Sequence, residues 1–192
     1  MDVHLQAFLI SAGLVALAEI GDRTQILSIL LAARYRKPIP ILAGVLVATI
    51  ANHLAAAALG SLAGNFLHGP WLKWILGFSF IAFAAWTLVP DKVSADDEPK
   101  EVGHGSVFLT TLVAFFLAEM GDKTQIVTIA LGARFHEILW VAAGTTTGMM
   151  IANAPAVYLG RMAGARLPVK AMRFVAAAAL LAQGIWVLAS PG

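Results

Sequence analysis

Acidic, basic and amide side chains occur together twice in this chain, in two seven-residue motifs one hundred positions apart. The motifs are Glu19-Ile20-Gly21-Asp22-Arg23-Thr24-Gln25 and Glu119-Met120-Gly121-Asp122-Lys123-Thr124-Gln125. Their surroundings match as well, because residues 17–35 and 117–135 align without a gap and agree at 12 of 19 positions. Both motifs lie within long apolar stretches, and one Asp, Lys or Arg at the centre of a membrane costs roughly 2.5–3.5 kcal/mol. Charged groups repeated in register therefore indicate a functional site built from two halves.

The charges of the two motifs favour one divalent cation as the ligand. Four carboxylates and two bases leave a net charge of −2 when all are ionised. The carboxylates belong to Glu19, Asp22, Glu119 and Asp122, and the bases are Arg23 and Lys123. The other donors are hydroxyl and amide oxygens, from Thr24, Gln25, Thr124 and Gln125. Oxygen ligands suit Ca²⁺, Mg²⁺ or Mn²⁺, whereas zinc and copper usually take sulfur or imidazole. We therefore predict a metal site with the four carboxylates as its first ligands.

The same carboxylates are expected to bind protons when the metal leaves, because like charges repel one another in a poorly hydrated pocket. Binding metal and protons in alternation is the minimal chemistry of a cation–proton exchanger. Another interpretation is that Glu19–Arg23 and Glu119–Lys123 are ion pairs with only a structural role. It leaves the two aspartates without partners, and unpaired buried carboxylates are costly. Each base is expected either to act as a counter-charge in the site or to extend outward to the membrane surface.

The geometry of one continuous helix would gather these donors on one side. At 100° per residue, Glu19 and Asp22 lie about 60° apart, and Gln25 lies about 60° further round. Arg23 follows Glu19 by four residues, which is the favourable order for an ion pair on one helix. Gly21, inside this set, permits either close approach of another helix or a local opening that frees backbone carbonyls.

The elements that carry the motifs are predicted to be membrane-spanning helices. Hydrophobic residues make up 59% of the 192 residues and charged residues only 12%, which is too few charges for the surface of a soluble domain. Six apolar segments, each long enough to cross a bilayer, cover about 5–33, 39–64, 71–90, 107–133, 138–164 and 170–189. The chain has no cysteine, and its net charge of +2 gives no support to nucleic-acid binding. The sequence thus predicts an all-α polytopic membrane protein, and without signal-peptide features the first segment is expected to be retained.

The repeat extends beyond the motifs and predicts two units of three helices each. We assign residues 1–90 to the first unit, 91–105 to an acidic linker and 106–192 to the second. An odd number of crossings makes the second unit enter from the opposite face, which gives an inverted repeat. Lys and Arg in the loops favour both termini outside the cytoplasm, with the linker inside. Small residues four apart, such as Gly60 and Gly64, are expected to permit close helix contact, and a homodimer interface is an alternative role for them.

Polar residues also interrupt the second and fifth segments. Asn52 and Asn153 are predicted either to add neutral oxygen ligands or to make hydrogen bonds between helices. At an offset of one hundred, His53 corresponds to Asn153, whereas a shift of one position would pair the two asparagines. His53 is interpreted either as a packing residue or as a ligand or proton relay. Pro155 removes a backbone hydrogen bond in the fifth segment, as is common around transport sites.

The doubled Glu-x-Gly-Asp-Lys/Arg-Thr motif in a chain with six apolar segments resembles the Golgi-type Ca²⁺/Mn²⁺–proton antiporter family. That family was long filed as uncharacterised protein family 0016 and is placed in the lysine-exporter superfamily; its bacterial members export manganese. The likeness covers essentially the whole chain. It implies that Glu19, Asp22, Glu119 and Asp122 are the motif carboxylates. It also implies a secondary transporter that exchanges Mn²⁺ or Ca²⁺ for protons without a prosthetic group, and that exports Mn²⁺ across a bacterial inner membrane.

Three other functions agree with parts of the sequence. An exporter of a cationic organic solute, such as a basic amino acid, would also use carboxylates but would need a roomier pocket with aromatic or hydrogen-bonding walls. An intramembrane aspartyl protease would use Asp22 and Asp122 as a pair that shares one proton, although each is flanked by a base and a glutamate. A structural membrane subunit would leave the carboxylates unexplained. We therefore expect a transporter and not an enzyme.

Overall fold

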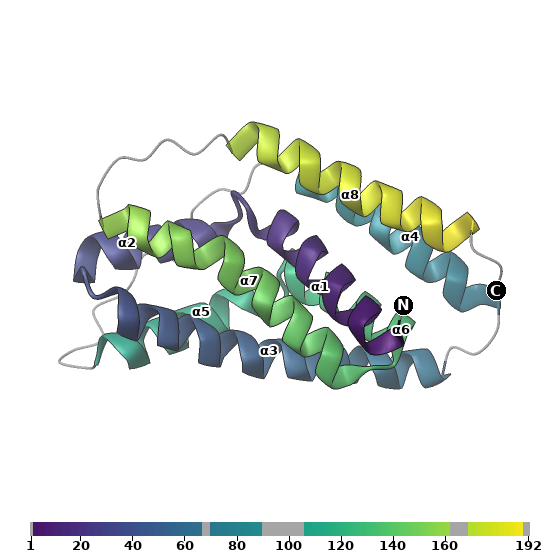
Figure 1. Cartoon of the computed structure of the whole chain (residues 1–192), viewed down its shortest axis with the longest axis horizontal. Coiled ribbons are helices and arrows are strands. Elements are labelled where there is room, and N and C mark those ends of the chain that lie inside the picture. Colours follow the sequence, from purple (N-terminus) through teal and green to yellow (C-terminus); the bar gives the residue numbers. More distant parts are fainter. Residues whose placement is uncertain (1, 67–69, 90–105, 162–168, 190–192) are drawn as a thin grey trace.

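The described part of the chain is entirely helical. The computed structural model describes residues 2–66, 70–89, 106–161 and 169–189, so the linker predicted at 91–105 lies outside the described residues. Within them, helices follow one another in the order α1 (Val3–Glu19), α2 (Arg23–Tyr35), α3 (Pro38–Phe66), α4 (Pro70–Thr87), α5 (Val107–Glu119), α6 (Lys123–Phe135), α7 (Ile138–Arg161) and α8 (Val169–Ala189) (Figure 1). These helices coincide with the six predicted segments, but two segments are each divided into two helices.

Both divisions fall inside the repeated motifs, so the expectation of one continuous helix through each motif is wrong. The axes of α1 and α2 meet at 68°. The backbone at Gly21 and Gly121 has φ of 78° and 77°, in the left-handed region that glycine adopts without steric cost. Of the two roles expected for Gly21, local opening of the helix is therefore confirmed.

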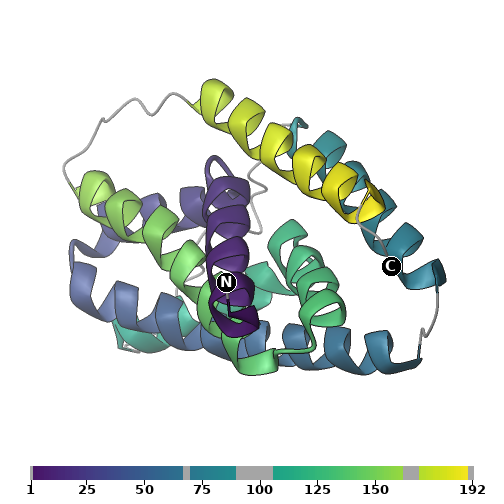
Figure 2. The same cartoon turned by 45° about the vertical axis from the view of Figure 1, so that its right-hand side comes forward.

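Helices of the two sequence repeats pack against each other reciprocally. α3 contacts α5 and α6, α7 contacts α1 and α2, and α4 lies beside α8, as Figures 1 and 2 both show. Glycines allow these contacts: a Cβ atom at Gly60 would overlap the backbone of Ile129 in α6, and one at Gly144 would overlap that of Phe8 in α1. The close helix contacts predicted for the small residues are confirmed at these positions. Each motif thus lies among helices from both repeats.

The distribution of polarity is the reverse of that in a soluble protein. Several charged and polar side chains are buried, among them Glu19, Asp22, Glu119, Asp122 and Lys123. Large apolar side chains are exposed along the outer faces, including Leu59 on α3, Phe78 on α4 and Trp186 on α8. Such an apolar surface is typical of a protein surrounded by lipid.

Length and hydropathy alone identify fewer crossings than the six expected. Among the described helices, only Pro38–Asn65 is by itself both long and apolar enough to span a membrane, and α1 with α2 qualifies if that bent pair is taken as one span.

Candidate metal centre

The four motif carboxylates lie at the ends of helices, where the breaks place them. Glu19 and Glu119 are the last residues of α1 and α5, and Asp22 and Asp122 precede the first residues of α2 and α6. A backbone hydrogen bond of 3.0 Å from the Asp22 N–H to the Glu19 carbonyl closes the first break, and its counterpart in the second motif measures 3.1 Å. Each break therefore holds one glutamate and one aspartate close together, although they belong to different helices.

The glutamine of each motif makes a hydrogen bond to the backbone of the turn in the same motif. The backbone N–H of Gly21 donates to Oε1 of Gln25 over 2.8 Å, and that of Gly121 donates to Oε1 of Gln125 over 2.7 Å. The Gln25 amide also donates to the Ala152 carbonyl of α7 over 3.0 Å. Because both amide oxygens accept hydrogen bonds from the backbone, the structure gives them a role in shaping the turn.

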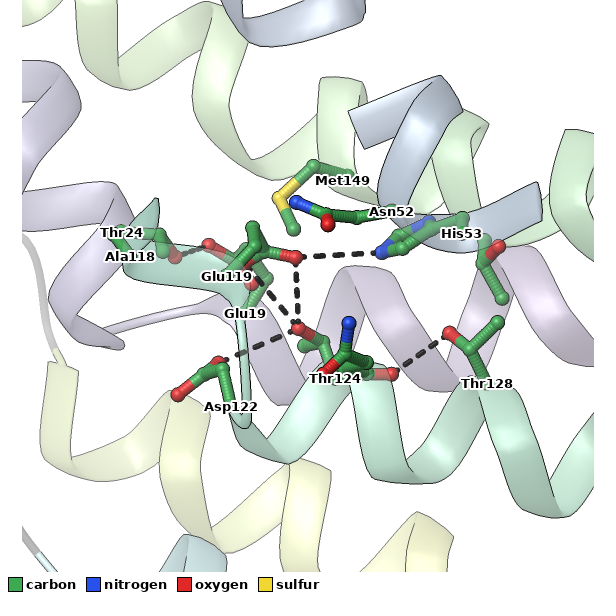
Figure 3. Close-up of polar contacts among 12 residues, drawn as sticks. Glu19, Thr24, Asn52, His53, Ala118, Glu119, Asp122, Thr124, Thr128 and Met149 are labelled. Carbon is green, nitrogen blue, oxygen red and sulfur yellow. Dashed lines mark hydrogen bonds and ion pairs between the residues drawn. The ribbon is translucent and has the colours of Figure 1, made fainter. Parts of the chain in front are cut away.

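Glu19 and Glu119 form the buried centre of the cluster, and both are fully inaccessible to solvent (Figure 3). Two buried carboxylates repel each other when both are ionised. The Thr24 hydroxyl donates to Oε1 of Glu19, whereas Oε2 has no hydrogen-bond partner among the described residues. In the second half, the Thr124 hydroxyl lies 3.4 Å from both oxygens of Glu119 and from Oδ2 of Asp122. Both threonine hydroxyls therefore face the carboxylates of their own motif.

The two bases contact the aspartates of the opposite motif. Nζ of Lys123 lies 3.2 Å from Oδ1 of Asp22, and Nε of Arg23 lies 3.2 Å from Oδ1 of Asp122. The interpretation of Glu19–Arg23 and Glu119–Lys123 as structural ion pairs does not match this geometry, in which each base contacts an aspartate of the other motif. The breaks are the physical reason, because they remove the four-residue spacing that a continuous helix would provide.

The crossed pairs differ in burial. The Lys123 side chain is 5% exposed and also lies 5.9 Å from the centre of the Trp86 ring of α4. The Arg23 side chain is 31% exposed and also donates a hydrogen bond to the Ala118 carbonyl. Both bases thus contact the opposite motif, and of the two roles left open for them a counter-charge stays the prediction that this geometry favours. Since each aspartate contacts a base, the pair does not have the geometry of an aspartyl-protease dyad.

The long helices α3 and α7 support the two glutamates from equivalent positions. Nδ2 of Asn153 donates to Oε1 of Glu19 over 3.1 Å, while its Oδ1 accepts from Ser28 over 2.7 Å. Nε2 of His53 lies 3.4 Å from Oε2 of Glu119. This correspondence agrees with the strict offset of one hundred, in which His53 matches Asn153.

Asn52 makes a different contact. Its amide donates to the Phe116 carbonyl over 3.1 Å, near the end of α5 where carbonyls lose their helical partners. Both asparagines therefore make hydrogen bonds between helices in this structure.

Two residues of this cluster were absent from the predicted ligand set. Ser28 orients Asn153, and His53 faces Glu119. The repeat itself contains the signal for His53, because position 53 corresponds to 153. Within the described residues, no three carboxylate, imidazole or thiol groups are placed to hold a metal ion together. Because each aspartate contacts a base, binding of a dication by all four carboxylates would require these contacts to open.

Comparison with known proteins identifies relatives along most of the chain. The family model described as "Divalent cation/proton antiporter GDT1" matches residues 7–95 and 107–191. A protein of Vibrio cholerae named "Putative manganese exporter" is 47% identical over 180 residues, which cover 93% of this chain and 88% of the relative. GDT1-like protein 4 of Oryza sativa subsp. indica is 30% identical over 84% of this chain and 65% of its own length. GDT1-like protein 5 of Arabidopsis thaliana is 26% identical over 97% of both chains. No solved structure shows significant similarity.

Proposed function

Because this chain belongs to the GDT1 family of divalent cation/proton antiporters, we propose that it exchanges Mn²⁺, or Ca²⁺, for protons and exports the metal from the cytoplasm. The family consists of membrane transporters and not of enzymes, and the metal is a transported substrate with no prosthetic group involved. The observation that carries the proposal is that the two motifs meet in the protein interior, where Glu19 and Glu119 are fully buried and each aspartate contacts the base of the opposite motif. Manganese is favoured over calcium by the name of the Vibrio cholerae relative.

The proposed ligands are the four motif carboxylates. Glu19 and Glu119 supply fully buried oxygens, and Oε2 of Glu19 has no hydrogen-bond partner among the described residues. Asp22 and Asp122 join them when Lys123 and Arg23 withdraw. Carboxylates, hydroxyls and amides are the hard donors that Mn²⁺ and Ca²⁺ prefer.

Exchange follows from competition for the same oxygens. In the state described, the two bases neutralise the aspartates, and protons on the glutamates would neutralise the rest of the cluster. A dication that enters displaces the protons and loosens the crossed pairs. Since metal and protons cannot occupy one carboxylate oxygen together, movement of one through the site drives movement of the other.

The architecture proposed for transport has six crossings. Each bent pair, α1–α2 and α5–α6, forms one crossing, and α3, α4, α7 and α8 form the others. Residues 1–90 and 106–192 are two inverted units joined by a cytoplasmic linker at 91–105, with both termini on the other side. The broken helices then bring their turns to the middle of the membrane, where transporters of this kind bind ions.

Ion uptake into proteoliposomes tests this function. Purified protein is reconstituted, a pH gradient is imposed, and uptake of Mn²⁺, Ca²⁺, Mg²⁺ and L-lysine is compared with protein-free vesicles. The proposal predicts uptake of Mn²⁺ that depends on the gradient and a reciprocal pH change inside the vesicles. Lysine transport without metal transport would contradict it and would support an exporter of cationic organic solutes.

A further inference from the structure

The two halves of the site differ at one equivalent position. Asn153 on α7 contacts Glu19, whereas His53 on α3 contacts Glu119. Asn153 is fully satisfied, because its amide group donates to Glu19 and the Met149 carbonyl and accepts from Ser28. The repeat therefore places a neutral amide beside one buried glutamate and an imidazole beside the other.

His53 is fully buried, and the hydrogen-bonding capacity of its two ring nitrogens is largely unused among the described residues. Its side chain has no solvent exposure, and neither ring nitrogen makes a hydrogen bond of ordinary geometry within the described part of the chain. Nε2 lies 3.4 Å from Oε2 of Glu119, and Figure 3 shows this contact as a dashed line between the two side chains. Buried polar groups in proteins are nearly always paired, and one without a partner requires an explanation such as a bound ion.

We infer that His53 is a ligand of the transported ion through Nε2 and that it makes the site prefer Mn²⁺ to Ca²⁺ and Mg²⁺. This inference rests on the proposed function and adds a nitrogen donor to its oxygen ligands. Adjacent ligands of an octahedral ion with bonds of about 2.1 Å lie about 3 Å apart. The 3.4 Å separation between Nε2 of His53 and Oε2 of Glu119 is close to that spacing, so a small shift lets one ion bind both atoms.

The preference follows from the chemistry of the donors. Ca²⁺ and Mg²⁺ are bound by oxygen ligands almost alone. Mn²⁺ has the lowest affinity in the series of first-row divalent transition ions, but as a transition ion it accepts an imidazole nitrogen more readily than Ca²⁺ or Mg²⁺ does. One nitrogen among carboxylate oxygens thus leaves a site that accepts all three ions but stabilises Mn²⁺ relative to the other two.

The ligand assignment is tested by electron paramagnetic resonance of Mn²⁺ bound to the full chain in detergent. Spin-echo modulation reports nitrogen atoms bonded to Mn²⁺, and selective labelling with ¹⁵N-histidine identifies them as imidazole. We expect histidine modulation in the unsubstituted protein and its loss in His53→Asn. This substitution gives position 53 the same residue type as the equivalent Asn153. His136→Asn, at an exposed position outside the cluster, is the matched control and should retain the modulation.

Selectivity gives a second, independent measurement. In proteoliposomes, His53→Asn should lower the ratio of Mn²⁺ to Ca²⁺ transport by about tenfold or more, the scale seen when groups around a metal are removed. Ca²⁺ transport by the variant shows that it is folded. Bound Mn²⁺ without histidine modulation in the unsubstituted protein would overturn the assignment while the proposed exchange stands. If the unsubstituted protein neither binds nor moves Mn²⁺, the proposed function and this inference both fail.

Discussion

Lys123 in the second motif lies 3.2 Å from Asp22 in the first, and both side chains are almost completely buried. The matching contact, from Arg23 to Asp122, has the same length but is about one-third exposed on the arginine side. The two motifs are therefore linked in both directions by charge, and each base belongs to the opposite half. This relationship explains how four of the six charged motif groups are accommodated inside one apolar bundle, because each aspartate is paired with a base.

The difference in burial between the two bases predicts a difference in stability. Lys123→Gln leaves the Asp22 carboxylate buried beside a neutral group and should destabilise the fold by about 3 kcal/mol. Arg23→Gln removes a more exposed partner and should cost about 1 kcal/mol or less. Thermal unfolding in detergent, followed by tryptophan fluorescence, compares the two variants. Equal destabilisation would show that the pairs are equivalent and would contradict the assigned burial.

Glu19 is predicted to be required for transport but unfavourable for stability. It is buried, and three other carboxylates repel its charge. Glu19→Gln keeps the shape and an oxygen that can accept from Thr24, but it removes the charge. We expect this variant to lose exchange of Mn²⁺ for protons while its unfolding temperature at pH 8 stays the same or rises. Transport at the original rate by the Gln variant would show that this carboxylate does not bind the ion.

The glycine at the second break is predicted to be needed for its backbone conformation. Gly121 has a φ of 77°, and a Cβ atom there would meet nothing within 4 Å. Gly121→Ala should therefore cost about 1 kcal/mol through the left-handed conformation alone, and it should slow transport because the break positions Asp122. Gly13→Ala is the matched control, since a Cβ atom is equally unobstructed there but the residue lies inside α1. That variant should be neutral or slightly stabilised, and a similar loss in both would argue against strain at the break.

Much of the site was predictable because the sequence contains it twice. The repeat identified the carboxylates, the bases and the threonines, and the apolar segments gave the positions of the helices. The correspondence of position 53 with 153 could be found from the same alignment. Glycine in each motif indicated that the helix could open, but a glycine inside an apolar run is also compatible with an unbroken helix and close packing.

The partners of the charges could not be derived from spacing. Arg23 follows Glu19 by four residues, and on a continuous helix the two would be neighbours. The turn at Gly21 separates them, and the reciprocal packing of α3 and α7 brings the two breaks together. Contacts between residues about one hundred positions apart, such as Lys123 with Asp22, depend on this tertiary arrangement and not on local sequence.

Acidity should weaken metal binding, because carboxylates must lose their protons before they bind a cation. Equilibrium dialysis of the detergent-purified chain with Mn²⁺ between pH 5.5 and 8 measures this. We expect the apparent affinity to fall steadily as the pH decreases and to recover when the pH is raised again. An affinity that does not depend on pH would exclude competition between Mn²⁺ and protons for the same groups.

The stoichiometry of Mn²⁺ binding distinguishes one shared site from two separate sites, because in the proposed site both motifs hold a single ion. At pH 8, the purified chain should bind one Mn²⁺, and either Glu19→Gln or Glu119→Gln alone should abolish that binding. Binding of two Mn²⁺ ions by each chain, with one ion lost in each variant, would show that the motifs are two separate sites and would contradict a single shared site.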